Sequence, residues 1–151
     1  MAKPINKSIV RAYDIRGVVD ETLYTIDIEK IGYAFASNLR QNNPSPTVYV
    51  GYDGRLSSVK LEQALIKGLT NAGAKVTRVG LCPTPMLYYA SVIMQADGAI
   101  MVTGSHNPPT HNGLKIVKDN KPFFGVDLQN LVQQAETINI KPTEPTPIQS
   151  L

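Results

Sequence analysis

Short runs of β-branched and aromatic residues alternate with helix-like apolar spacings along most of this chain. The runs at 47–52, 75–80 and 98–103 have the length and composition of strands. Between the first two, apolar residues recur at intervals of three and four, which predicts a helix over 57–73. Alternating strands and helices favour an α/β fold, and we expect a three-layer α/β/α domain with a mixed, mostly parallel sheet.

Further segments extend this pattern. Apolar spacing predicts a helix over 26–40, and Thr84 followed by Pro85 predicts the N-cap and first position of another helix. The segment 113–124 predicts a strand and a turn, and Asp127 is the expected N-cap of a last helix. Because no helix precedes the strand in 113–124, we expect that strand to run antiparallel to its neighbour.

The chain divides into one domain and a linker. Its 151 residues are enough to bury about two thirds of the unfolded surface around one core. Residues 1–138 hold the predicted strands and helices, whereas 139–151 are rich in proline and lack apolar periodicity. We expect 139–151 to be a linker towards a second domain that this chain lacks.

Charge and cysteine content exclude several classes of partner. The net charge is only +3, and no basic run is interleaved with aromatic residues, so we expect no nucleic acid. The amino terminus lacks the apolar region of a secretory signal, and the single cysteine, Cys82, cannot form an internal disulfide, which favours the cytoplasm. No apolar run approaches the roughly 18 residues of a membrane span, so we expect no membrane partner.

The segment TGSHNPP, residues 103–109, follows an apolar run and ends in a double proline. Open α/β sheets bind ligands beyond the carboxyl ends of their strands, so we expect Ser105 to be exposed and held fixed at a functional position. The residue types alone leave an ordinary turn, a serine hydrolase and a stand-alone anion-binding module open. The hydrolase is the weaker alternative, because G-x-S-x-G is missing and the adjacent Ser105 and His106 are expected to point apart.

Five motifs occur in the order in which the α-D-phosphohexomutase superfamily has them. They are RAYDIRGVV (11–19), GYDGRLSS (51–58), PTPMLYY (83–89), TGSHNPP (103–109) and NGLKIV (112–117). Together they are far more specific than any one alone, and the resemblance covers most of residues 8–135. The loop is most similar to the phosphomannomutase/phosphoglucomutase branch, with phosphoglucosamine mutase as the alternative.

The resemblance implies a reaction and three catalytic residues. In this family a serine donates a phosphoryl group to a hexose phosphate, which gives a 1,6-bisphosphate, and then recovers a phosphoryl group from the other end. Carried over, Ser105 is the phosphoserine, and Arg16 and Lys115 are the cations beside it. Arginine stays charged and binds oxygen pairs bidentately, which suits a clamp, while lysine suits a clamp or a general acid/base.

The resemblance also implies contact and supporting residues. His106, Asn107 and Tyr13 are expected to contact the phosphoryl group or the substrate, with packing against the loop as the alternative for Tyr13. Asp53 and Arg55 occupy the positions of a structural ion pair, and Arg55 has site orientation as a second, open role.

The resemblance further implies cofactors and partners. It implies Mg²⁺, held in this chain only through the phosphate on Ser105, and glucose 1,6-bisphosphate or mannose 1,6-bisphosphate as activator and intermediate. The family's metal loop, sugar-reading loop and distal phosphate loop do not occur in this sequence. The chain therefore resembles the amino-terminal domain of an isomerase, inactive alone, whose partners are its hexose phosphate substrate and the remaining domains of the same polypeptide.

Overall fold

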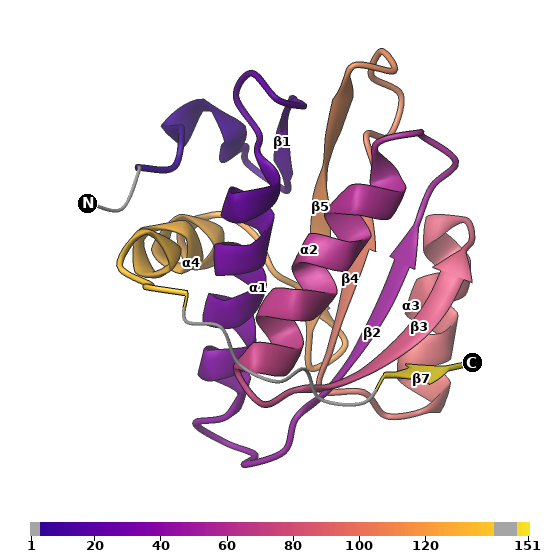
Figure 1. Ribbon diagram of the computed structural model, residues 1–151. Helices are drawn as coiled ribbons and strands as arrows, with labels where there is room; N and C mark the ends of the chain where they lie inside the picture. Colours follow the sequence, from indigo (N-terminus) through magenta and orange to yellow (C-terminus); the bar gives the residue numbers. More distant parts are fainter. Residues whose placement is uncertain (1–3, 141–147) are drawn as a thin grey trace.

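The computed structural model describes residues 4–140 and 148–151, and within these seven strands form one mixed sheet (Figure 1). The strands are β1 (Ile15–Val18), β2 (Thr47–Tyr52), β3 (Lys75–Leu81), β4 (Gly98–Val102), β5 (His111–Lys118), β6 (Lys121–Pro122) and β7 (Gln149–Ser150). The helices are the short 3-10 helix η1 (Lys7–Ile9) and the α-helices α1 (Thr25–Leu39), α2 (Ser58–Asn71), α3 (Thr84–Ile93) and α4 (Val126–Glu136). The strand order is β1-β5-β4-β2-β3-β7, with β6 paired to β5.

The sheet has a parallel half and an antiparallel half. Strand β2 runs parallel to β3 and β4, and β7 runs parallel to β3. Strand β5 runs antiparallel to β4 and β1, which confirms the orientation expected for the strand in 113–124. Strand β1 is an element that the sequence analysis did not predict.

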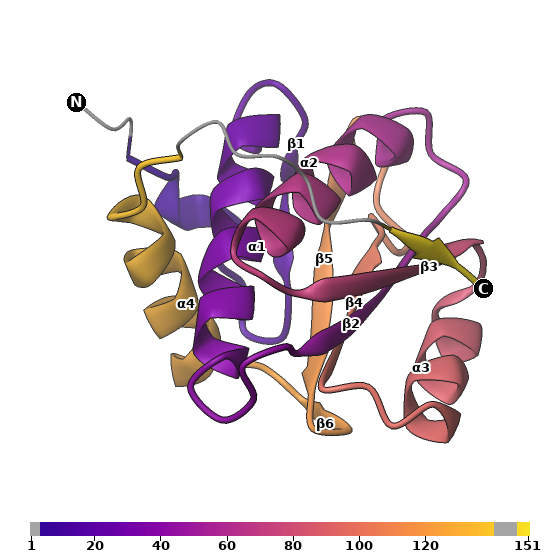
Figure 2. The same cartoon turned by 60° about the horizontal axis from the view of Figure 1, so that its bottom comes forward.

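Helices cover both faces of the sheet, which confirms the three-layer α/β/α prediction (Figures 1 and 2). Helices α1 and α2 pack on one face with α4 beside α1, over alternate strand residues such as Val50, Ile100 and Leu114. Helix α3 packs on the other face over β2 and β4, against Met101 among others. The strand alternation therefore divides the core into two layers of side chains.

Two helix starts differ from the sequence prediction. The N-cap of α3 is Pro83, so Thr84 is the first helical residue rather than the cap. The N-cap of α4 is Gly125, which has a φ of 61°, so Asp127 lies in the first turn near the positive end of the helix. No helix in the described part of the chain is long and apolar enough to cross a membrane.

The predicted linker is described only in part. Residues 141–147 of it lie outside the described residues, and Gln149–Ser150 pair with β3 at the edge of the sheet. The domain limits 1–138 and 139–151 stay a prediction.

The contact between α1 and α2 depends on a glycine. A Cβ placed on Gly68 of α2 would overlap the carbonyl oxygen of Glu29 in α1. We predict that Gly68→Ala lowers the free energy of unfolding by about 1–3 kcal/mol, because the overlap forces the helices apart. Alanine has the higher helix propensity, so an unchanged or raised free energy in urea unfolding would contradict this packing. Gly54→Ala is the control, since a Cβ there meets nothing within 4 Å.

Candidate active site

The loop between β4 and β5 lies beyond the carboxyl ends of the parallel strands β2 and β4. The amide of Thr103 still donates to the carbonyl of Gly113 (3.0 Å), so the two strands stay paired up to the loop. Ser105 then takes a φ of 56°, the left-handed region that non-glycine residues rarely adopt. A strained residue at this edge of an α/β sheet marks a candidate site.

The carboxylate of Asp53, directly after β2, anchors the start of this loop. It accepts hydrogen bonds from Ser58 Oγ (2.6 Å), Thr103 Oγ1 (2.9 Å), the Gly104 amide (3.1 Å), the Arg55 amide (3.1 Å) and Arg55 Nε (3.2 Å). Burial by itself raises the pKa of the Asp53 carboxyl, but the hydrogen bonds, led by that from Ser58, lower the pKa below its usual value. Asp53 is therefore a carboxylate built to stay ionised.

The guanidinium of Arg55 holds the rest of the loop. It donates to the backbone carbonyl oxygens of Ser105 (3.0 Å), Asn107 (2.7 Å), Pro108 (2.6 Å) and His111 (3.3 Å). A Cβ on Gly104 would overlap this guanidinium, so only glycine lets Arg55 lie against the loop. The expected ion pair of Asp53 and Arg55 is present, with Nε 3.2 Å from Oδ2. Its two side chains bond to the loop backbone, Asp53 at the Gly104 amide and Arg55 at the Ser105 carbonyl.

A buried asparagine links this network to β5 and to the start of α2. The side-chain amide of Asn112 donates to Ser57 Oγ (2.9 Å) and Ser58 Oγ (3.0 Å), and its oxygen accepts from the Gly113 amide (2.9 Å). Ser58 Oγ in turn donates a hydrogen bond to the Asp53 carboxylate, so Asn112 is linked to Asp53 through Ser58. Sequence reasoning missed this role of Asn112, although the residue opens the NGLKIV motif.

Ser105 itself is less accessible than the sequence analysis expected. Its residue is half-buried, and within the described structure its Oγ is enclosed and has no hydrogen-bond partner, so the expectation of an exposed serine was wrong. His106 is exposed, and the side-chain amide of Asn107 donates to the Gly104 carbonyl (2.9 Å) within the loop.

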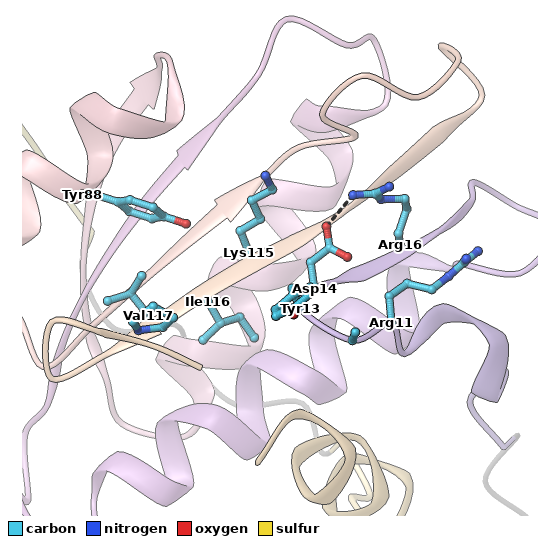
Figure 3. A pocket seen from close by; sticks show the side chains of 10 residues that line it. Arg11, Tyr13, Asp14, Arg16, Tyr88, Lys115, Ile116 and Val117 are labelled. Carbon is cyan, nitrogen blue, oxygen red and sulfur yellow. Dashed lines mark hydrogen bonds and ion pairs between the residues drawn. The ribbon is translucent and has the colours of Figure 1, made fainter. Parts of the chain in front are cut away.

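The two predicted catalytic cations share a pocket of about 550 Å³ on the α3 side of the sheet (Figure 3). Arg16 of β1 pairs with Gly113 of β5, and Lys115 lies two residues further along β5, so alternation puts both side chains on one face. Helix α3 covers β2 and β4, while this pocket lies over β5 and β1. The cations therefore sit where the sheet face is open.

Sequence reasoning missed an acidic partner in this pocket. The carboxylate of Asp14, a buried residue, lies 2.7 Å from a terminal nitrogen of Arg16, as the dashed line in Figure 3 shows. Arg11 and Tyr88 also line the pocket. Burial, and then the charge of Asp14, raise the pKa of the Tyr88 hydroxyl, so Tyr88 is neutral at pH 7. Asp14 and Arg16 are two residues apart in the RAYDIRGVV motif, a spacing that puts both side chains on one face of an extended segment, but β1 was not predicted and the signal was not used.

Tyr13 lines the same pocket and is 77% exposed. Its ring packs against that of Phe124, with 5.8 Å between the centroids. Contact with a ligand is thus open to Tyr13, whereas the ring contact that the structure shows is with Phe124, outside the Ser105 loop.

The site residues form two groups at one end of the sheet. Arg16 and Lys115 meet in the pocket, while Asp53 and Arg55 enclose the Ser105 loop. Ser105 does not line the pocket, but Thr103, two residues before it, bonds to Gly113, the partner of Arg16. Within residues 4–140 and 148–151, no three His, Cys, Asp or Glu side chains are grouped so that they could hold a metal ion.

Asp53→Asn tests the anchor through its pH dependence. We predict that it lowers the free energy of unfolding at pH 7 by about 1.5–3 kcal/mol, because hydrogen bonds to a charged acceptor are lost. The pKa of Asp53 is lowered on folding, so the stabilisation is present above the ordinary pKa near 3.9 and is lost as pH falls through the folded pKa. Urea unfolding should therefore show a smaller difference between the two proteins at pH 3 than at pH 7. An equal difference at both pH values, or one matched by the exposed Asp119→Asn control, would contradict the assignment.

Known proteins resemble this chain over most of its length. The family model of phosphoglucomutase/phosphomannomutase, alpha/beta/alpha domain I, matches residues 7–141. The phosphomannomutase/phosphoglucomutase of Pseudomonas aeruginosa is 44% identical over 135 residues, which are 89% of this chain and 29% of that relative. The phosphoglucomutase of Neisseria gonorrhoeae is 39% identical over 132 residues, 87% of this chain and 28% of the relative. These relatives are phosphomutases, a class of isomerase.

A solved structure agrees with the fold. The crystal structure of a phosphoglucomutase/phosphomannomutase family protein from Burkholderia thailandensis has a TM-score of 0.80 and 41% identity, over 87% of this chain and 30% of that one. The chain thus spans less than a third of the length of the curated relatives it matches. The resemblance stated from the five motifs is confirmed: the chain belongs to the phosphoglucomutase/phosphomannomutase family and corresponds to its α/β/α domain I.

Proposed function

We propose that this chain is the phosphoserine domain of a phosphomannomutase/phosphoglucomutase, which interconverts hexose 1-phosphates and 6-phosphates through a 1,6-bisphosphate. The observation that carries the proposal is the Oγ of Ser105, which is enclosed, has no hydrogen-bond partner among the described residues and lies on a loop that Arg55 fixes. A hydroxyl without a partner on a fixed loop can carry a phosphoryl group, and the transfer requires that the Oγ becomes accessible to the substrate. Family membership supplies the reaction class.

The transfer step moves one phosphoryl group between two oxygens. The P–O bond to Ser105 Oγ breaks, a P–O bond to a hydroxyl of the hexose phosphate forms, and the proton of that hydroxyl ends on Ser105 Oγ. The reverse transfer from the other phosphate of the bisphosphate restores the phosphoserine. Such a transition state needs positioning and charge stabilisation more than covalent help from the protein.

Arg16 and Lys115 supply charge near this step. A phosphoserine carries about −1.5 to −2 charge, and one cation about 4 Å away contributes roughly 4 kcal/mol at an effective dielectric of 20, before desolvation. Arg16 is the clamp, and its contact with Asp14 fixes the direction of the guanidinium. Lys115 is a second clamp or a general acid/base, and His106, Asn107 and Tyr13 are the proposed contacts to the phosphoryl group or sugar.

Mg²⁺ and the bisphosphate activator belong to the same proposal. The described residues offer no carboxylate cluster for a metal ion, so this domain fits Mg²⁺ only through a phosphate on Ser105. When bound, the ion would neutralise charge on the transferring group. Glucose 1,6-bisphosphate or mannose 1,6-bisphosphate is the activator, the remaining domains of the polypeptide are the partners, and the cytoplasm is the proposed location.

The experiment compares this chain with the longer protein that contains it. We expect the longer protein to form glucose 6-phosphate from glucose 1-phosphate, with Mg²⁺ and catalytic glucose 1,6-bisphosphate, in a coupled assay. We expect phosphopeptide mapping of the active protein to find phosphate on Ser105. Residues 1–151 alone should melt cooperatively and show no turnover, because orientation of the substrate by distant sites supplies about 7–11 kcal/mol of such barriers. Sustained turnover by 1–151, or active protein with phosphate on another serine only, would overturn the proposal.

Separate substitutions test the two cations. In the longer protein we predict that Arg16→Ala and Lys115→Ala each lower kcat by on the order of 10² or more, because each removes a preorganised charge from the transition state. Lys75→Ala is the matched control, since Lys75 is exposed at the far end of β3 and should leave kcat unchanged. A kcat within a factor of two of the wild type for either variant would remove that residue from the site.

A further inference from the structure

The outer face of α3 is apolar and exposed. Met86, Tyr89, Val92 and Ile93 point away from the sheet, and each exposes between 51% and 69% of its surface. Their spacing along the helix puts them in one stripe. Within the described residues nothing covers this stripe, whereas Leu87 and Ala90 on the inner side are buried against the sheet.

The sequence of this region has no charge. Between Pro83 and Ala96 no Asp, Glu, Lys or Arg occurs, so α3 is apolar on both faces. A helix of that kind is normally buried on both sides. Other large exposed apolar residues, such as Leu56 and Val126, lie on other elements, and single ones are usual on protein surfaces.

The path of the chain leads towards this stripe. Strand β7 runs parallel to β3, and the amide of Leu151 donates to the carbonyl of Arg78 (3.0 Å). In that direction β3 continues to Leu81, which is 65% exposed, and α3 begins at Thr84. Figures 1 and 2 show β7 at the edge of the sheet, on the same side of the molecule as α3. A continuation of the chain would pass the start of α3.

The size of the stripe favours a tethered partner. Four side chains exposed by half or more present on the order of 500 Å², which is below the about 800 Å² per partner of a stable complex between free proteins. It is enough for an interface between domains of one chain. Tethering raises the effective concentration, so a smaller contact suffices. The matched relatives are long enough to contain a tethered partner domain, because this domain covers only 29% of the Pseudomonas aeruginosa protein.

We propose that the outer face of α3, together with Leu81, is the docking surface for the domain that follows Leu151 in the parent polypeptide. The proposal rests on the proposed function, which includes such domains. Tyr88, the neighbour of Tyr89, lines the pocket of Arg16 and Lys115, so a domain docked on α3 stands beside that pocket.

Hydrogen exchange measured by mass spectrometry tests the surface. The amides of 84–93 should exchange at least tenfold more slowly in the longer protein than in residues 1–151, because docking stabilises α3. Ile93→Lys should raise that exchange in the longer protein and lower its Tm by about 3 °C or more, while the Tm of 1–151 changes by less than 1 °C. Val126→Lys is the matched control, an exposed apolar residue on α4 whose replacement should affect both proteins alike.

Several results would overturn the proposal. Equal exchange of 84–93 in both proteins, or an equal effect of Ile93→Lys on both, would show that no later domain docks there. Dimerisation of 1–151 at micromolar concentration in sedimentation, abolished by Ile93→Lys, would make a second copy the occupant instead. Neither exchange nor melting depends on turnover, so an inactive longer protein would refute the proposed function and leave the docking result readable.

Discussion

The loop between β4 and β5 keeps its shape because one guanidinium bonds to three of its carbonyl groups and to the first residue of β5. Arg55 donates to the carbonyl groups of Ser105, Asn107 and Pro108 in the loop and of His111 in β5, and Asp53 accepts from both that guanidinium and the Gly104 amide at the start of the loop. The loop has little regular structure of its own, and Arg55 supplies donors to the carbonyl groups of Ser105 and Asn107, while the carbonyl of Pro108 also accepts from the His111 amide (2.9 Å). Hydrogen bonds to charged groups contribute about 1.5–3 kcal/mol each, so loss of the Arg55 side chain would weaken the middle of the loop, while Asp53 would still hold Thr103 and Gly104. The position of Ser105 follows from this arrangement.

The two halves of the candidate site have different physical origins. Arg55 fixes the Ser105 loop through polar contacts, whereas sheet alternation alone puts Arg16 and Lys115 on one face. Helix α3 lies over β2 and β4 and leaves the face of β5 and β1 open. Charged side chains are stable on that part of the sheet because they remain partly hydrated there. Because α3 covers only β2 and β4, the face of β5 and β1 can hold a cationic pocket on an otherwise apolar sheet.

Periodicity made most of the fold predictable from the sequence, and long-range contacts account for what was missed. Helices α1 and α2 and strands β2 to β5 each carry a local signal, so their existence was predicted. Strand β1 has only four residues and pairs with β5 about a hundred residues later, which no local pattern shows. The N-cap of α4 is Gly125 rather than the predicted Asp127, because glycine accepts the positive φ there without strain. Asn112 was missed for the same reason as β1, since its partners Ser57 and Ser58 lie far away in the sequence, whereas Asp14, two residues before Arg16, was missed because β1 itself was not predicted.

Ser105 combines two local costs that an ordinary turn would avoid. A left-handed backbone costs a non-glycine residue about 1–2 kcal/mol, and a buried hydroxyl without a partner costs about 1–3 kcal/mol. Glycine at this position would remove both, and the contacts of Arg55 would remain, because they use only the backbone carbonyl of residue 105. Stability of the turn therefore does not explain the serine. The proposed function accounts for the hydroxyl, because a phosphoryl group on Oγ would add three acceptor oxygens, and the contacts of Arg55 hold the strained residue that would carry it at this edge of the sheet.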